Sequence, residues 1–222
     1  MAITEVQLIS MLEMQNSMNS RVNANWLAAN NNWFRAIKVE GVEAIEHHGW
    51  KWWKKQECDM AQLRMELVDI WHFILSAALQ HKHGNVVLSK MEMLAELNLC
   101  QKSIQFDNQY YMLTQMTLLA KLDLLVGMAT SKRISLTLFE SLLHDCDMEW
   151  NDLFKQYVGK NVLNIFRQDN GYKSGAYIKI WNGREDNEHL VDILELIDLE
   201  SANVYDELYH CLNERYVSVL EK

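Results

Sequence analysis

The stretch MAQLRMELVDIWHFILSAALQH, residues 60–81, decides the fold class of this chain. Its apolar side chains recur at alternating spacings of three and four residues, which places them on one face of an α-helix. They are Met60, Leu63, Leu67, Ile70, Ile74 and Ala77. Such a seam is typical of helices that pack side by side in a bundle. The sequence therefore predicts a bundle helix over 60–81.

The composition around this helix favours an all-α fold. The 222 residues include no proline and only 8 glycines, the residues that punctuate strands, turns and long loops. A sandwich or a barrel would need more of them. With 49% apolar residues the chain has enough material for a core. We expect a single all-α domain over 1–222, a helical bundle with no β-sheet core.

Helix signals continue along the chain. Thr4 followed by Gln7 forms a capping box, which predicts a first helix that runs to about Val22. The remaining helices are expected at 33–48, 86–102, 109–129, 134–147, 149–166, 188–198 and 203–220.

Two stretches are expected to be loops. The first, 23–32, is rich in asparagine. The second is 167–187, because four of the eight glycines fall between Gly159 and Gly183. Long loops in compact helical domains are usually functional or disordered.

Charge and cysteine content exclude several classes of protein. Lys plus Arg total 21 against 30 Asp plus Glu, a formal net charge of −9, which opposes general binding to nucleic acid or to an anionic membrane. The longest run without a charged residue, 22–34, is shorter than a membrane helix. The four cysteines form no CxxC pair, which disfavours a disulfide scaffold or a zinc ribbon. We expect a soluble cytoplasmic protein that binds neither nucleic acid nor membrane.

Two acidic pairs stand inside apolar helices. Glu40 and Glu43 are three residues apart, as are Glu66 and Asp69, so both carboxylates of a pair share one helix face. If the two helices are adjacent and antiparallel, the four carboxylates converge. Such hard oxygen clusters suit Mg²⁺ or Mn²⁺, whereas a di-iron site would need Glu-x-x-His pairs. One pair alone is usually a solvated face; two pairs within apolar helices favour a divalent metal site.

Two side-chain amides interrupt the apolar stripe of the first helix. Gln15 and Asn19 share a face with Leu8, Leu12 and Val22. Either the helix turns toward solvent after Leu12, or the amides face a polar planar ligand. A carboxamide offers both a donor and an acceptor, which suits the edge of a nucleobase.

A basic cluster lies near the glycine-rich region. Lys160, Asn164 and Arg167 share a helical face, and Lys173 follows in a loop flanked by glycines. Arginine and lysine clustered at a helix end are typical phosphate contacts, although such residues also interact with the helix dipole. Together with four carboxylates, this cluster predicts the complementary half of a nucleotide site.

These motifs resemble those of the dimeric all-α dUTPases, which are related to dCTPases and MazG-type pyrophosphatases. The resemblance rests on Glu40-Gly-Val-Glu43, on Glu66-Leu-Val-Asp69-Ile-Trp-His-Phe, and on GKNVLNIFRQDNGYKSG over 159–175. It extends through KIWNGREDN, residues 179–187. The last two strings are the more specific and favour a dUTPase over a dCTPase or a MazG enzyme.

The resemblance implies an all-α NTP pyrophosphatase fold and an Mg²⁺-dependent enzyme. It would hydrolyse dUTP to dUMP and pyrophosphate, and dUDP to dUMP and phosphate, which keeps uracil out of DNA. Two or three Mg²⁺ ions, or Mn²⁺ as a substitute, would be held by Glu40, Glu43, Glu66 and Asp69. Glu40 and Glu43 are the implied catalytic carboxylates, and Glu43 would deprotonate the attacking water. The activity toward dUDP favours attack at the β-phosphorus.

Substrate contacts are also implied. Gln15 and Asn19 would bind uracil, and Phe73 would pack under the deoxyribose. The sugar 3′-hydroxyl would contact Asn164. The other implied substrate-binding residues, most of them on the leaving phosphate, are Lys160, Arg167, Tyr172 and Lys173.

The resemblance further implies a homodimer whose partner chain contributes to the site, and the tryptophan-rich segment 50–53 is the candidate contact. Two alternatives remain from the residues. One is another all-α nucleotide pyrophosphatase, such as a dCTPase or a MazG-like house-cleaning enzyme. The other is a helical metal- or nucleotide-binding module without turnover.

Overall fold

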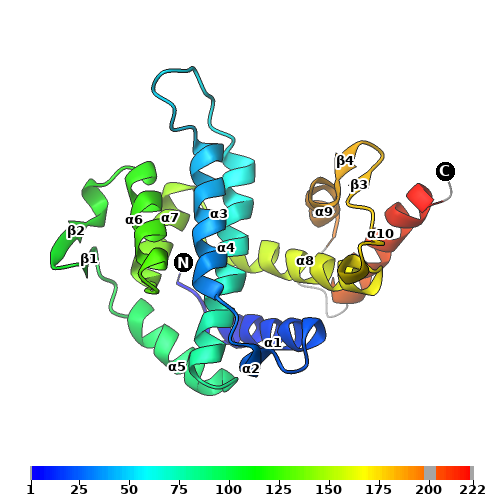
Figure 1. The fold of residues 1–222 in the computed structure, drawn as a ribbon, viewed down its shortest axis with the longest axis horizontal. Helices are drawn as coiled ribbons and strands as arrows, with labels where there is room; N and C mark the ends of the chain where they lie inside the picture. The colour runs from blue at the N-terminus through cyan, green and yellow to red at the C-terminus, as the bar shows by residue number, and fades with distance from the viewer. Residues whose placement is uncertain (1, 198–203, 221–222) are drawn as a thin grey trace. The chain divides into compact units, whose positions relative to one another are not determined.

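Figure 1 shows the fold of the chain in a computed structural model, which describes residues 2–197 and 204–220. The chain forms two compact units, Met1–Leu153 and Phe154–Lys222. The division falls within helix α8 (Trp150–Asp169).

Helices make up most of the first unit. Helix α3 packs on α4 and α6, and α1 packs on α4 and α5. The bounds are α1 (Glu5–Val22), α2 (Trp26–Ala29), α3 (Trp33–His48), α4 (Met60–His81), α5 (Val86–Leu97), α6 (Leu118–Thr130) and α7 (Leu136–Asp145). Within the described residues the strands form only two-stranded sheets. The predicted all-α bundle without a β-sheet core is confirmed.

Polar side chains cap the N-termini of α1, α3 and α4, the helices that carry the candidate site residues of the first unit. Thr4 and Gln7 form the predicted capping box of α1. Asn32 and Asp59 cap α3 and α4, because the side chain of each accepts the backbone N–H three residues on. Both helices have the bounds that the sequence predicts.

The apolar seam of α4 lies in the core of the first unit. Its fully buried members are Leu63, Leu67, Ile70 and Ile74. Beside them Trp71 stacks on Phe139, with ring centroids 5.1 Å apart, and meets Trp150 edge-to-face at 5.2 Å. Burying an apolar side chain of this size contributes about 1.5–3 kcal/mol, so this seam holds α4 firmly in place.

A glycine in α3 allows a close helix approach. A Cβ at Gly41 would lie 2.9 Å from Cγ2 of Val126 on α6, well inside the optimal separation of carbon atoms. This contact explains the glycine between Glu40 and Glu43.

The expected helix over 109–129 is wrong in its first part. Strands β1 (Ser103–Phe106) and β2 (Gln109–Met112) pair antiparallel there. Between them Asp107 and Asn108 have φ values of 51° and 61°, the left-handed conformation of a tight two-residue hairpin turn. The aromatic residues of β2 favour a strand, and the shortage of glycine and proline concealed this signal.

Other expected bounds need smaller corrections. The helix expected over 86–102 ends at Leu97, and a 3₁₀ turn, η1 (Leu113–Gln115), precedes α6. The expected loop 23–32 contains the short helix α2. None of the described helices combines the length and apolarity of a membrane span.

The expected loop 167–187 contains ordered elements. After α8 come the 3₁₀ turn η2 (Tyr172–Ser174) and a hairpin of β3 (Ile180–Trp181) and β4 (Arg184–Glu185). Helices α9 (Asp186–Leu194) and α10 (Val204–Leu220) follow. The predicted end of the helix 188–198 and the predicted start of the helix 203–220 lie outside the described residues.

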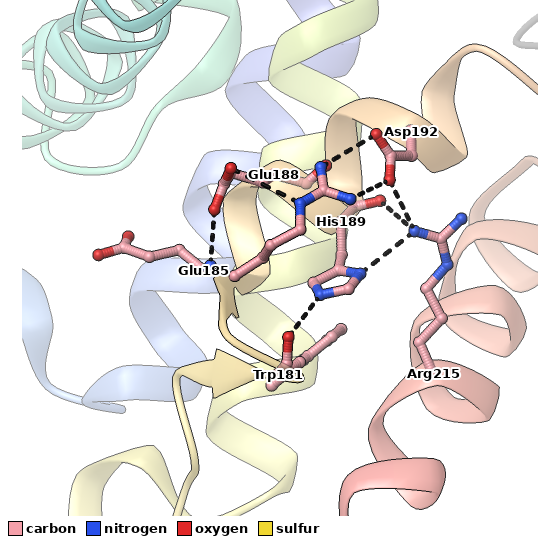
Figure 2. A network of polar contacts seen from close by, with 7 residues as sticks. Trp181, Glu185, Glu188, His189, Asp192 and Arg215 are labelled. Atoms are coloured by element: carbon pink, nitrogen blue, oxygen red, sulfur yellow. Dashed lines mark hydrogen bonds and ion pairs between the residues drawn. The ribbon is translucent and has the colours of Figure 1, made fainter.

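A polar network joins α9, α10 and the hairpin of the second unit (Figure 2). Arg215 Nη1 donates to the backbone oxygen of His189 over 3.2 Å and lies 3.3 Å from Asp192. Arg184 donates to the same Asp192 at 2.8 and 3.2 Å. His189 Nε2 donates to the backbone oxygen of Trp181 over 2.9 Å. These bonds fix the first turns of α9 against the hairpin.

Candidate active site

Three glutamates converge where α3 and α4 run side by side as an antiparallel pair (Figure 1). One carboxylate oxygen from each of Glu40, Glu43 and Glu66 lies within 4.8 Å of the others. Glu66 is buried, Glu40 is half-buried and Glu43 is exposed. The predicted convergence of the two acidic pairs thus holds for these three residues, and we call them the acidic cluster.

The surroundings of Glu40 in the acidic cluster favour its protonated form. Burial is the largest cause that raises the pKa of Glu40, followed by the charges of Asp69, Glu66 and Glu43, and together they bring it from 4.5 to about 8. Asp69 lies outside the converging set but adds negative charge to it. A divalent cation would stabilise all of these carboxylates as anions, so the donor set fits Mg²⁺ or Mn²⁺.

A histidine that the sequence did not single out as a site residue lies beside the acidic cluster. His47 Nε2 is 3.3 Å from Oε1 of Glu66. The spacing of four residues from Glu43 already places His47 on the same face of α3. A residue that bonds to a metal-binding carboxylate without touching the ion often tunes the affinity of that carboxylate for the ion.

The two amides of α1 are buried, which excludes the solvent-facing alternative. Gln15 and Asn19 have only 4% and 6% of their surface exposed. Gln15 Nε2 donates to Oδ1 of Asn19 over 3.0 Å, and Asn19 Nδ2 donates to Oγ of Ser76 over 3.0 Å. The oxygen of Gln15 accepts from Nδ1 of His72 at 2.8 Å. Ser76 was missed from the sequence, although a serine one turn after His72 in an apolar helix is a recognisable signal.

Phe73, one turn after Asp69 on α4, packs with two tryptophans of α2 and α3. The rings of Phe73 and Trp33 are stacked, with centroids 6.3 Å apart and an interplanar angle of 25°. Trp26 meets Trp33 edge-to-face at 6.1 Å. Nε1 of Trp33 is buried and makes no hydrogen bond within the described part of the chain. The stack on Trp33 holds the ring of Phe73 in place.

In the second unit, Arg167 is held by a carboxylate. Its Nε and Nη2 donate to the two oxygens of Asp186, each over 2.8 Å, and its Nη1 donates to Oδ1 of Asn164 over 3.0 Å. The hydroxyl of Tyr177 donates to the same Asp186 over 2.7 Å. A bidentate pair of this kind fixes the plane of the guanidinium.

Asp186 is completely buried but remains an anion. Burial by itself raises the pKa of this carboxyl, but the hydrogen bonds and charge of Arg167 outweigh burial and leave the pKa below its ordinary value. Asp186 stands in the WNGREDN string, but the sequence did not indicate its partner.

The other predicted phosphate-side residues differ in exposure. Lys160 is 3% exposed, on α8. Tyr172 and Lys173 are exposed on η2, and the guanidinium of Arg167 lies 6.0 Å from the centroid of the Tyr172 ring. The structure thus brings Asn164, Arg167 and Tyr172 together within the second unit.

A family model described as dUTPase matches residues 7–172 of the chain. The chain belongs to this dUTPase family. The matched range contains the acidic cluster, both amides of α1 and all of α8, and it crosses the division between the two units. No curated protein matches the chain.

Membership of the dUTPase family decides between the alternatives. The chain is a dUTP diphosphatase, which hydrolyses dUTP or dUDP to dUMP. The family match favours a dUTPase over a dCTPase, over a MazG-like enzyme and over a binding module without turnover. A dUTPase of this family depends on a metal ion, in agreement with the acidic cluster.

Proposed function

We propose that the acidic cluster is the catalytic metal site of this dUTPase and that it takes Mg²⁺. The observation that carries the proposal is the convergence of three carboxylates around a Glu40 whose pKa is raised to about 8. Glu40, Glu43 and Glu66 would hold the ions, with Asp69 as a further ligand. Bound Mg²⁺ lowers the pKa of water and neutralises phosphate charge.

Glu43 is the proposed general base, supported by its position as the exposed member of the acidic cluster. Its carboxylate would take a proton from the attacking water, whose oxygen forms a bond to the β-phosphorus. The bond from that phosphorus to the oxygen of dUMP then breaks, and dUMP leaves. The other product is pyrophosphate from dUTP, or phosphate from dUDP.

The residues that the sequence indicated as substrate contacts are the ones that we propose to bind the nucleotide. Gln15 and Asn19 would bind uracil, and Phe73 would support the deoxyribose. The phosphate and sugar contacts of the second unit would come from Lys160, Asn164, Arg167, Tyr172 and Lys173. Because the family model spans both units, we propose that they act as one dUTPase domain over 1–222.

We also propose a cytoplasmic homodimer. The hydrolysis of dUTP keeps uracil out of DNA, and the nucleotide pool is inside the cell. The four cysteines are free thiols, as a reducing compartment favours. Trp52 and Trp53 are 85% and 59% exposed, and a second copy of the chain would cover them.

The test is hydrolysis of dUTP, dCTP, dTTP and UTP by the purified protein with Mg²⁺ and with excess chelator. We expect preference for dUTP, and loss of turnover in the chelator. Glu43→Ala should lower kcat by about 10²-fold or more while circular dichroism stays unchanged. Glu13→Ala, the same change at an exposed position of α1, is the control. Turnover by Glu43→Ala at the rate of this control would overturn the proposed site.

A further inference from the structure

A single hydroxyl sets the direction of a buried hydrogen-bonded ring between α1 and α4. Ser76 Oγ lies 2.9 Å from the backbone oxygen of His72, which can only accept, and 3.4 Å from Oδ1 of Asn19, so its one proton goes to the shorter contact with His72. The hydroxyl must therefore accept from Asn19, which turns Nδ2 of that amide toward Ser76. Ser76 is fully buried and His72 is 5% exposed.

The direction passes on to the second amide. With Nδ2 turned to Ser76, the oxygen of Asn19 faces Gln15 and accepts from its Nε2 at 3.0 Å. The oxygen of Gln15 consequently faces His72, whose Nδ1–H closes the ring over 2.8 Å. If either amide turned over alone, donor would face donor or acceptor would face acceptor. If both turned over, the Ser76 proton would point to Asn19 and the 2.9 Å bond to the backbone oxygen of His72 would be lost, and either change is costly in a buried setting.

We propose that Ser76 and His72 are positioning residues that set the base specificity of this dUTPase. The inference rests on the proposed function, in which Gln15 and Asn19 bind uracil. Uracil presents an N3–H donor between two carbonyl acceptors, whereas cytosine presents an N3 acceptor beside an amino donor. A side-chain amide that rotates by 180° exchanges the positions of its NH₂ donor and its oxygen acceptor, so a free amide could bind either base. The ring holds both amides in one orientation, so the site rejects the base with the opposite pattern.

The test compares kcat/KM for dUTP with that for dCTP in Ser76→Ala. Loss of the hydroxyl removes the group that orients Asn19, so we expect the dUTP preference to fall roughly tenfold or more. A ring that only fastened α1 to α4 would instead lower both activities equally and leave the preference unchanged. The matched control is Ser89→Ala. Its hydroxyl is also fully buried, but bonds to the backbone oxygens of Asn85 and Ala78.

A second pair of variants keeps the test decisive if Ser76→Ala does not fold. His72→Leu removes the donor to Gln15 and should lower the dUTP preference, while His72→Asn keeps an N–H near the position of Nδ1 and should restore it. A wild-type enzyme without preference for dUTP would overturn the proposed function. A wild-type preference that survives in Ser76→Ala or His72→Leu would overturn only the role of the ring.

Discussion

Glu40 makes the stability of the metal-free protein depend on pH. Its pKa is about 8 in the folded chain against an ordinary 4.5, first because of burial and then because of its acidic neighbours. Between these values the folded state keeps a proton that the unfolded state loses. The free energy of unfolding therefore decreases as the pH rises from about 5 to about 8. Thermal unfolding in excess chelator measures this slope.

The variant Glu40→Gln isolates the contribution of this carboxyl. A neutral amide cannot titrate, so the variant should lose the part of the slope that Glu40 supplies. Mg²⁺ should raise the Tm of the wild type more at about pH 8 than at about pH 6, because its ligands must be ionised. An equal slope in wild type and Glu40→Gln would show that Glu40 is already ionised at neutral pH.

The sequence predicted which helix face a residue occupies, because periodicity determines the face. It did not predict the hydrogen-bond partners of that residue. The stripe of α1 indicated that Gln15 and Asn19 share a face, yet the residues that orient them are on α4, far along the chain. The same holds for Arg167, since no spacing rule points to Asp186. Hydrogen bonds between distant segments depend on packing, which local periodicity does not contain.

At the scale of elements, two helical glycines with different surroundings predict opposite effects of alanine. A Cβ at Gly159 on α8 would lie 2.8 and 2.9 Å from the two methyl groups of Leu194 on α9, whereas a Cβ at Gly127 on α6 meets nothing within 4 Å. Gly127→Ala should raise the free energy of unfolding by about 0.5–1 kcal/mol. Gly159→Ala should lower it by about 1–3 kcal/mol through overpacking.

Urea denaturation of the two glycine variants checks this contrast. Because both changes gain the same helix propensity, the difference between them reports the contact with Leu194 alone. Equal stabilisation of both variants would mean that Leu194 moves aside without cost.

Long helices were predictable because apolar periodicity and caps agree. The bounds of α3 and α4 match the prediction at both ends, and each begins after an Asn or Asp cap. The β1–β2 hairpin was not predictable from the same rules, because its turn is Asp107-Asn108 and contains no glycine. Asparagine and aspartate tolerate the left-handed conformation, so a hairpin can form without the usual punctuation.

At the scale of the whole molecule, composition predicted the fold class but not the division into two units. The division lies inside α8 between residues 153 and 154, and neither of these residues is a glycine or a proline. Domain boundaries are usually read from linkers rich in such residues, and none occurs here. The family model also crosses this point, which is the reason for our proposal of a single functional domain.

The exposed tryptophans of the loop between α3 and α4 lead to a prediction about assembly. Trp52 and Trp53 meet edge-to-face at 4.5 Å, and large exposed aromatic side chains are characteristic of protein interfaces. We expect the wild type to have about twice the 26.1 kDa of one chain in light scattering, and Trp52→Ser/Trp53→Ser to weaken the dimer at least tenfold. Tyr110→Ser, which changes a side chain that is 75% exposed on β2, is the control and should remain dimeric. A wild type with the mass of one chain would refute the homodimer. An unchanged dimer in the double variant, with the control also dimeric, would place the interface on another surface.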